Sequence, residues 1–299
     1  MREEELIGLA GKYFSPGLRA GEISRGIGDD CAVVRFDDRN DLVITCDTLC
    51  EGTHFLKGTP SEKVARKLLA VNLSDVAAMG GEPWLAVLSF AAPRGIPDKY
   101  ARAFFAALGK EAEKFGLAIV GGDCVASKTL TLTLTLLGKV RRGRALLRSG
   151  ARENDMVFVT GRLGGTLKSG RHLSFEPRLA EARWLAKNFR PSAMMDLSDG
   201  LLEDGGKLAR ASSLTMDLRG GLVPRAEGCG LREALTGGED FELLLTVPAE
   251  NFSERKRTLF QKKFGLELSL VGAMIPRGGA DLLLDGKKPA WRGYAHVGV

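Results

Sequence analysis

Residues 130–140 read LTLTLTLLGKV and begin with a strict alternation of leucine and threonine. Successive side chains of a β-strand point to opposite faces, so this pattern predicts a strand with one buried face and one polar face. The other elements predicted in this half of the chain are strands at 31–36, 42–47, 85–90 and up to 121–122, and helices at 3–13, 60–79 and 97–115. Strands and helices are therefore mixed from the start of the chain.

A polar and basic segment at 141–154 separates this group of elements from a second one. The second group is predicted to hold strands at 156–160, 193–197, 241–247, 266–272 and 281–285, and helices at 178–188 and 199–211. Because the order lacks the strict βαβ alternation of a doubly wound sheet, the expected fold class is α+β. We expect one domain at 1–140 and a second at 141–299.

Aspartates recur where an apolar run meets a glycine or a helix start, although the chain carries 43 Lys and Arg against 37 Asp and Glu. The motifs are GIGDD (26–30), TCDT (45–48), NLSD (72–75), GGDC (121–124), DLSDG (196–200) and GGED (237–240). Carboxylates that gather in one cleft repel each other unless a cation neutralises them, and Mg²⁺ prefers such oxygen ligands together with substrate phosphates. The pattern predicts a magnesium site, and the alternative for each single aspartate is an ordinary turn.

Two helix starts carry competing interpretations. Thr59 is predicted to cap the helix that begins at Pro60, with Glu62 completing a capping box. At the second start, Ser198 can cap the helix at 199–211 and Asp199 is favoured by the helix dipole. The same DLSDG corner could instead hold a metal ion through two carboxylates, and the residues alone leave both interpretations open.

Other chemistries have weaker support in the sequence. There is no GxxxxGK[ST] motif, which disfavours a P-loop nucleotide site. GRLGG at 161–165 lies between a predicted strand and a helix, which is a possible anion-binding turn. The three histidines lie far apart, and no serine, cysteine or histidine has an evident base partner for covalent catalysis.

Composition excludes several classes of protein. No apolar run approaches the ~18 residues of a membrane span, and the start of the chain lacks a secretory signal, so a cytoplasmic protein is expected. The basic runs at 141–144 and 262–263 are short and lack aromatics, which argues against a nucleic-acid partner. The five cysteines are odd in number and form no CxxC pair, so reduced thiols are expected.

Taken together, the motifs resemble the thiamine-monophosphate kinase family. The resemblance runs from about residue 22 to the C-terminus and rests on GIGDD (26–30), CDTL followed by HF (46–55), NLSDVAAMGGEP (72–83), GGD (121–123), LRSGA (147–151), DLSDGL (196–201) and GGEDFELL (237–244). It implies an α+β N-terminal domain that dimerises through its sheet, and an α/β C-terminal domain that covers an ATP cleft. The implied reaction transfers the γ-phosphoryl group of ATP to thiamine monophosphate, giving thiamine diphosphate and ADP.

The resemblance also implies a role for individual residues. The implied ligands of several Mg²⁺ ions are Asp30, Asp47, Asp75, Asp123, Asp196 and Asp199, with Thr45 and Cys46 beside them on the strand. The implied ATP contacts are Gly122, Asp123, Arg148 and Ser198. The implied contacts to the acceptor are His54, Glu239 and Tyr294. No catalytic nucleophile is implied, because metal ions can align two polyanions and neutralise them without a covalent intermediate.

Two departures from the family pattern stand out. Gly165 occupies a place where an acid is common, and Cys46 a place where a hydroxyl residue is common, so its backbone carbonyl is the better metal ligand. The alternatives to this function are an enzyme of the same superfamily with a different small acceptor, and a nucleotide- and metal-binding module without catalysis. Selenophosphate synthetase is disfavoured because no cysteine precedes Cys31, and the hydrogenase maturation factor because the chain does not end in cysteine.

Overall fold

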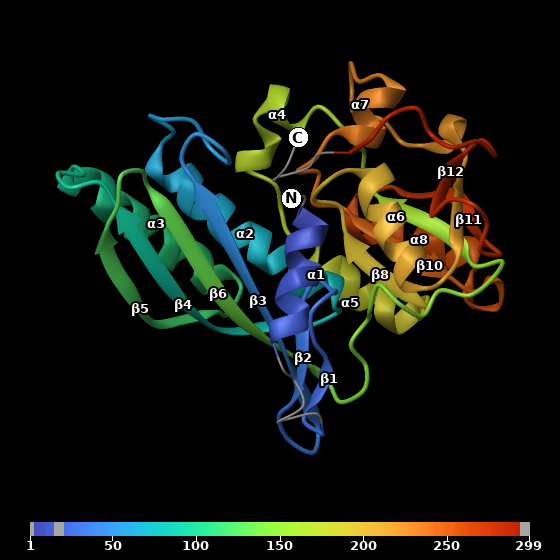
Figure 1. The fold of residues 1–299 in the computed structure, drawn as a ribbon, viewed down its shortest axis with the longest axis horizontal. Helices are drawn as coiled ribbons and strands as arrows, with labels where there is room; N and C mark the ends of the chain where they lie inside the picture. Colours follow the sequence, from blue (N-terminus) through green and yellow to red (C-terminus); the bar gives the residue numbers. More distant parts are fainter. Residues whose placement is uncertain (1–2, 15–20, 294–299) are drawn as a thin grey trace.

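The computed structural model describes residues 3–14 and 21–293, and these contain two six-stranded sheets joined by helices (Figure 1). The first sheet has the order β1-β2-β3-β6-β4-β5, and all its pairs are antiparallel except β4 with β5. Its strands are β1 (Ile23–Arg25), β2 (Ala32–Arg35), β3 (Asn40–Cys50), β4 (Glu82–Ala92), β5 (Ala118–Ala126) and β6 (Thr131–Arg141). The predicted alternating strand is β6, which lies between β3 and β4.

The alternation of β6 has the expected physical result. Leu132, Leu134 and Leu136 are fully buried, while the threonines between them lie on the opposite face and are only half-buried. The buried face is covered by α2 (Ser61–Ala78) and α3 (Asp98–Lys114). Each fully buried leucine contributes about 1.5–3 kcal/mol relative to an exposed one, so this face anchors the first sheet.

The second sheet has the order β12-β9-β11-β7-β10-β8 and is antiparallel except for β12 with β9. Its strands are β7 (Met156–Thr160), β8 (Ala193–Asp196), β9 (Thr215–Leu218), β10 (Leu243–Val247), β11 (Leu268–Ile275) and β12 (Leu282–Leu284). The remaining helices are α1 (Glu3–Tyr13), α4 (Thr166–Ser169), α5 (Leu179–Asn188), α6 (Leu201–Ala211), α7 (Leu231–Thr236) and α8 (Glu254–Phe264). The α+β class predicted from the mixed order is confirmed by these two sheets.

Helix α2 lies between the two halves of the molecule and contacts both of them (Figure 1). It packs on β3 and β6 in the first half and on α5 and β8 in the second. Most of its residues are buried, and one hydrophobic core runs from the first sheet through α2 to Phe158, Phe189 and Phe260 of the second half. Polar residues that emerge from this buried helix are therefore held in fixed positions.

The start of α2 differs from the prediction. The helix begins at Ser61, Pro60 is its N-cap, and no side chain caps it, so the capping box with Thr59 is wrong. The hydroxyl of Thr59 instead donates to the carbonyl oxygen of Leu56 at 2.7 Å. Short hydroxyl side chains readily bond to nearby backbone groups in this way, which removes them from the helix end.

Among the described residues, no helix has the length and apolar character needed to cross a membrane. All five cysteines lie in the described part of the chain, and all five are free thiols, as expected.

Candidate active site

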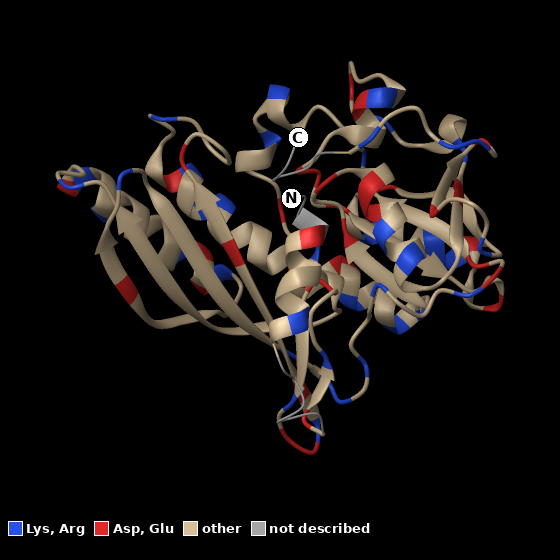
Figure 2. Ribbon diagram, in the orientation of Figure 1, with Lys and Arg blue, Asp and Glu red and all other residues tan. Residues whose placement is uncertain are grey.

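Three carboxylates from distant parts of the sequence meet where the two halves face each other. Ligand oxygens of Asp30, Asp75 and Asp196 all lie within 4.8 Å of one another. Asp30 precedes β2, Asp75 lies on α2, and Asp196 ends β8, so each comes from a different element. Figure 2 shows acidic segments gathered between the two halves of the ribbon. The structure therefore brings together three of the predicted metal ligands.

The environment of this trio of carboxylates favours the binding of a cation. Burial raises the pKa of Asp196 well above its usual range, and the charge of Asp30 raises it further. The pKa of Asp75 is also raised well above its usual range, first by burial and then by the charges of Asp47 and Asp196. Oxygen Oδ2 of Asp30 is buried and has no hydrogen-bond partner. A buried carboxylate oxygen without a partner, next to two further carboxylates, fits a bound divalent cation.

Residues on β3 and α2 support the trio from both sides. Thr45 donates its hydroxyl to Asp75, and the backbone N–H of Asp47 donates to Asn72 at 3.3 Å. Ser74 donates its hydroxyl to Asp196 at 2.5 Å. Asn72 is fully buried, so the NLSD segment of α2 is not a solvated helix edge.

Two cations lie against the acidic residues. Arg148 donates to Oδ1 of Asp30 from Nε at 3.1 Å and from Nη2 at 2.6 Å. Lys207 of α6 forms ion pairs with Asp199 and with Asp204, the latter at 3.0 Å. Burial lowers the pKa of Lys207, but the two carboxylates outweigh it and the pKa rises overall. In the metal-free protein, Arg148 thus neutralises part of the charge of Asp30. Lys207 likewise neutralises part of the charge of Asp199 and Asp204.

The DLSDG corner is not capped by Ser198. The N-cap of α6 is Gly200, no side chain caps it, and the helix begins at Leu201. Oδ2 of Asp204 instead accepts the backbone N–H groups of Asp199 and Gly200, at 2.9 and 3.1 Å. Because Asp204 reaches back to the helix start, the side chain of Ser198 is not needed there. Asp199 is buried next to Lys207, close to but outside the trio.

A second polar group lies nearer the start of α2. Lys67 and Ser74 are seven residues apart, so they share one face of the helix, about 10 Å apart along its axis. Ser74 binds Asp196, and Lys67 binds Oε1 of Glu239 at 2.5 Å and the carbonyl oxygen of His54 at 2.8 Å. The two predicted acceptor contacts, His54 and Glu239, are therefore joined by one ammonium group.

His54 and Glu239 are each held in a defined geometry. Nδ1 of His54 accepts the backbone N–H of Cys50 at 3.0 Å, so the neutral ring carries its hydrogen on Nε2. Glu239 has a φ of 62°, in the left-handed region that is costly for a residue with a side chain. Its backbone N–H donates to the carbonyl oxygen of Ser198 at 2.6 Å. This strained residue is thus tied to the DLSDG corner.

The GRLGG loop binds the carboxylate of Asp240, a residue of the same chain. The backbone N–H of Gly164 donates to both oxygens of Asp240, at 2.9 and 3.1 Å, and Arg171 donates to Asp240 at 3.0 Å. Gly164 has a φ of 90°, which suits glycine. The interpretation of this turn as a phosphate site is therefore not supported, because its donor already has an internal partner.

Asp123 does not join the trio within one chain. Thr48, Thr133, Ser89 and Asp123 face one another in register across β3, β6, β4 and β5. Three strand spacings separate Asp123 from Thr48, about 14 Å. Asp123 is exposed on the edge strand, and beside it a Cβ atom on Gly122 would lie 1.8 Å from the carbonyl oxygen of Leu88, which explains the glycine.

Two more predicted residues have particular positions. The side chain of Cys46 is exposed on the sheet face opposite Thr45, where it accepts a hydrogen bond from Thr135 at 3.3 Å, so it points away from the trio. Tyr294 lies outside the described residues. Its neighbour Gly293 is packed so tightly that a Cβ atom there would be 2.7 Å from the carbonyl oxygen of Asp199. The chain thus reaches the site just before Tyr294.

Sequence reasoning missed several residues of the site. Lys67, Ser74, Asp204 and Lys207 lie within helices, whereas the predicted ligands were recognised mainly at the ends of strands and the starts of helices. A periodicity argument could have found Lys67, because it interrupts an otherwise apolar face of α2 and is fully buried. Buried lysine is rare unless it is paired.

Comparisons with known proteins cover nearly the whole chain. Residues 28–140 match the family described as AIR synthase related protein, N-terminal domain. Thiamine-monophosphate kinase of Salmonella typhimurium is 33% identical over 96% of this chain and 97% of its own length, and that of Bacillus subtilis is 32% identical over 80% and 82%. A solved structure, AaThiL complexed with AMPPCP and TMP, superposes with a TM-score of 0.86 at 30% identity and covers 99% of this chain and 97% of that one. The chain therefore belongs to the thiamine-monophosphate kinase family of enzymes.

Proposed function

We propose that the enzyme phosphorylates thiamine monophosphate with ATP, forming thiamine diphosphate and ADP. The observation that carries this proposal is the trio of Asp30, Asp75 and Asp196, with one buried oxygen lacking a partner, at the meeting of the two halves. The trio suits a reaction between two polyanions, whose mutual repulsion must be overcome before they can react. The whole-length similarity to thiamine-monophosphate kinases supports thiamine monophosphate as the acceptor.

We propose Mg²⁺ as the cofactor, held as several ions. The proposed ligands are Asp30, Thr45, the carbonyl of Cys46, Asp47, Asp75, Asp123, Asp196 and Asp199. Oxygen-only donors of this kind fit a hard divalent cation. Burial and then the neighbouring carboxylates raise the pKa of Asp75 and of Asp196, and a bound cation would offset both effects. When bound, Mg²⁺ neutralises phosphate charge and aligns donor and acceptor oxygens.

The residues of the chain bind and orient the nucleotide. Arg148 presents a guanidinium group beside Asp30, where it can bind a phosphate oxygen. Ser198, whose side chain is not used as a helix cap, and the backbone at Gly122 and Asp123 are the other proposed ATP contacts. The acceptor oxygen is already ionised near pH 7, so positioning is the main contribution of the protein and no general base is required.

The acceptor is proposed to bind at His54, Glu239 and Tyr294. The N–H on Nε2 of His54 can donate to a phosphate oxygen, since Nδ1 is occupied by Cys50. The carboxylate of Glu239 is complementary to the amino group and the cationic ring of thiamine. Lys67, which lies two helical turns from Ser74, links these contacts to the metal trio.

We propose that the enzyme is a homodimer in which Asp123 of one copy completes the site of the other. Asp123 is about 14 Å from β3 in its own chain, on an edge strand that exposes Val120 and Val125 at 61% and 50%. Exposed apolar side chains on an unpaired edge strand are typical of an interface. A second copy packed on this sheet face would cover them.

The remaining proposals concern domains and location. The two sheets separate between Arg141 and Met156, which supports domains at 1–140 and 141–299. The free cysteines and the use of ATP support a cytoplasmic location.

An ADP-release assay tests the proposed function. Thiamine monophosphate, thiamine and aminoimidazole precursors are compared as acceptors with Mg²⁺ and ATP. Of these acceptors, only thiamine monophosphate is expected to support ADP release. Turnover only with another acceptor would favour a different enzyme of the superfamily, and nucleotide binding without turnover would favour a non-catalytic module.

A further inference from the structure

Lys67 is a buried cation that connects three separate segments of the chain. It lies on α2 with a side chain that is 0% exposed. Its ammonium group donates to Oε1 of Glu239, which precedes β10, and to the carbonyl oxygen of His54, in the loop after β3. The hydrogen bonds of this ammonium group therefore connect the first half of the molecule to the second.

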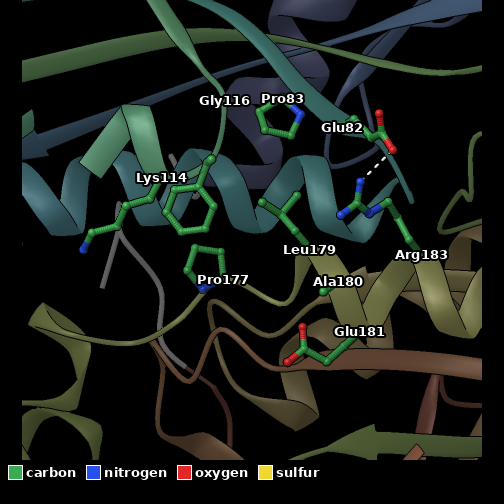
Figure 3. A pocket seen from close by; sticks show the side chains of 10 residues that line it. Glu82, Pro83, Lys114, Gly116, Pro177, Leu179, Ala180, Glu181 and Arg183 are labelled. Atoms are coloured by element: carbon green, nitrogen blue, oxygen red, sulfur yellow. Dashed lines mark hydrogen bonds and ion pairs between the residues drawn. The ribbon is translucent and has the colours of Figure 1, made fainter. Parts of the chain in front are cut away.

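Other ion pairs also cross between the halves, but they differ in burial. Arg183 of α5 pairs with Glu82 of β4 at 2.6 Å, and these side chains are 47% and 65% exposed. Figure 3 shows this pair at the rim of a separate cavity of about 430 Å³ lined by α3, β4 and α5. Exposed pairs of this kind contribute little, because water screens them. Lys67 is the contrasting case, in which the charge is withdrawn from water.

Burying Lys67 has a cost that packing alone does not explain. Desolvation lowers its pKa, and the pairing with Glu239 only partly restores it. Replacing both members of a buried ion pair by apolar side chains of similar volume is often neutral or stabilising, so the pair is not required for packing. Lysine at this position is therefore better explained by what it holds in place than by the packing of α2.

The segment that Lys67 holds is strained. Glu239 and Phe241 have φ values of 62° and 50°, and such backbone is retained only where surrounding contacts impose it. The backbone N–H of Glu239 is fixed by Ser198, and its carboxylate is fixed by Lys67. The side chain of Glu239 remains 22% exposed, so part of it is accessible from solvent although Lys67 holds its carboxylate.

We propose that Lys67 is a positioning residue for the acceptor: it holds Glu239 of the second half and the His54 loop of the first half in the arrangement that binds the acceptor. This inference rests on the proposed function, since it takes His54 and Glu239 as acceptor contacts. Lys67 acts through these residues and does not touch the metal trio, from which it is separated by two turns of α2.

The test compares Lys67→Met with Arg183→Met, which also removes a cation that pairs across the two halves. Steady-state kinetics with Mg²⁺ are measured for both substrates. In Lys67→Met, the KM for thiamine monophosphate is expected to rise about 10- to 100-fold, since small displacements of binding groups have effects of this size. The KM for ATP is expected to stay within about twofold, because ATP is bound at the trio. Arg183→Met is expected to leave both values near wild type.

A milder variant keeps the proposal testable if Lys67→Met does not fold. Lys67→Gln can still donate to His54 and Glu239 without the charge, and it is expected to raise the KM for the acceptor by at least about threefold. A double-mutant cycle with Glu239→Gln supplies a second readout, in which the effects of Lys67→Gln and Glu239→Gln should be clearly non-additive. Additive effects, or a lower thermal midpoint with an unchanged acceptor KM, would overturn the positioning role.

Failure of this inference can be told apart from failure of the proposed function. If the wild-type enzyme converts thiamine monophosphate while the variants at Lys67 bind it normally, only the positioning role is refuted. If the wild-type enzyme does not convert thiamine monophosphate, the proposed function itself is refuted.

Discussion

Replacing Asp196 by asparagine removes a charge from the metal trio while nearly preserving the shape of the side chain. Without metal, the charged oxygens of Asp30, Asp75 and Asp196 lie within 4.8 Å of one another. Two unit charges at this distance repel by about 3.5 kcal/mol at an effective dielectric constant of ~20. Asp196 has no direct ion pair among the contacts of the described residues, and its hydrogen bond from Ser74 can also be accepted by the asparagine oxygen.

The expected gain in stability is smaller than one full repulsion. Arg148 already offsets part of this repulsion through its ion pair with Asp30. We therefore expect Asp196→Asn to stabilise the metal-free protein by about 1–2 kcal/mol, a rise in Tm of about 2–6 °C. In the same variant, kcat/KM should fall at least ~10²-fold, about 3 kcal/mol of transition-state stabilisation.

Thermal denaturation in EDTA and in Mg²⁺, together with ADP-release kinetics, measures both effects. The wild type should gain stability on adding Mg²⁺ and the variant should gain much less. Ser198→Ala serves as the control at the same corner, because its side chain does not cap α6, and its free energy of unfolding should change by less than about 0.5 kcal/mol. Near-normal kcat/KM in Asp196→Asn would refute the assignment of Asp196 to a metal site.

Three further predictions concern other parts of the molecule. Mixing the variants Asp123→Asn and Asp196→Asn should restore activity through mixed dimers with one intact site, and no recovery after subunit exchange would contradict the shared site. Gly122→Ala should lower the free energy of unfolding by about 3 kcal/mol in urea titrations, because its Cβ would lie 1.8 Å from a backbone oxygen, whereas Gly121→Ala meets no atom within 4 Å and serves as the control. Burial raises the pKa of Asp240 to about 7, so the folded state binds the proton more tightly than the unfolded state does. Stability should therefore fall as the pH rises from about 4 to 7, by on the order of 4 kcal/mol, and urea titrations of Asp240→Asn should lack this slope.

The elements that the sequence predicted well are those whose burial depends on a local pattern. The alternation at 130–140 became β6, and the helix predicted at 97–115 became α3 (Asp98–Lys114). By contrast, β9 (Thr215–Leu218) and α8 (Glu254–Phe264) were not predicted. The first is a four-residue strand that is fully buried and shows no alternation, and the second is a highly polar helix with one fully buried residue, Phe260. Tertiary packing, which a sequence window does not contain, determines both of them.

The sequence predicted which residue types form the site better than it predicted which of them contact one another. Asp30, Asp75 and Asp196 were identified because each belongs to a recognisable motif, and the structure brings them together. The position of Asp123 could not be predicted, because it depends on the order of strands in the sheet rather than on the sequence around it. Lys67 was missed for a similar reason, since its partners lie in two separate loops, one after β3 and one before β10.

We propose that the acidic trio supports metal-dependent transfer of a phosphoryl group to thiamine monophosphate. The most direct test is to incubate the enzyme with ATP and thiamine monophosphate, and to measure ADP and thiamine diphosphate with Mg²⁺, with EDTA, and with EDTA followed by excess Mg²⁺. Equal amounts of the two products are expected with Mg²⁺, none with EDTA, and recovery when Mg²⁺ is restored. Full formation of thiamine diphosphate in EDTA, or ADP release without thiamine diphosphate, would contradict this proposal.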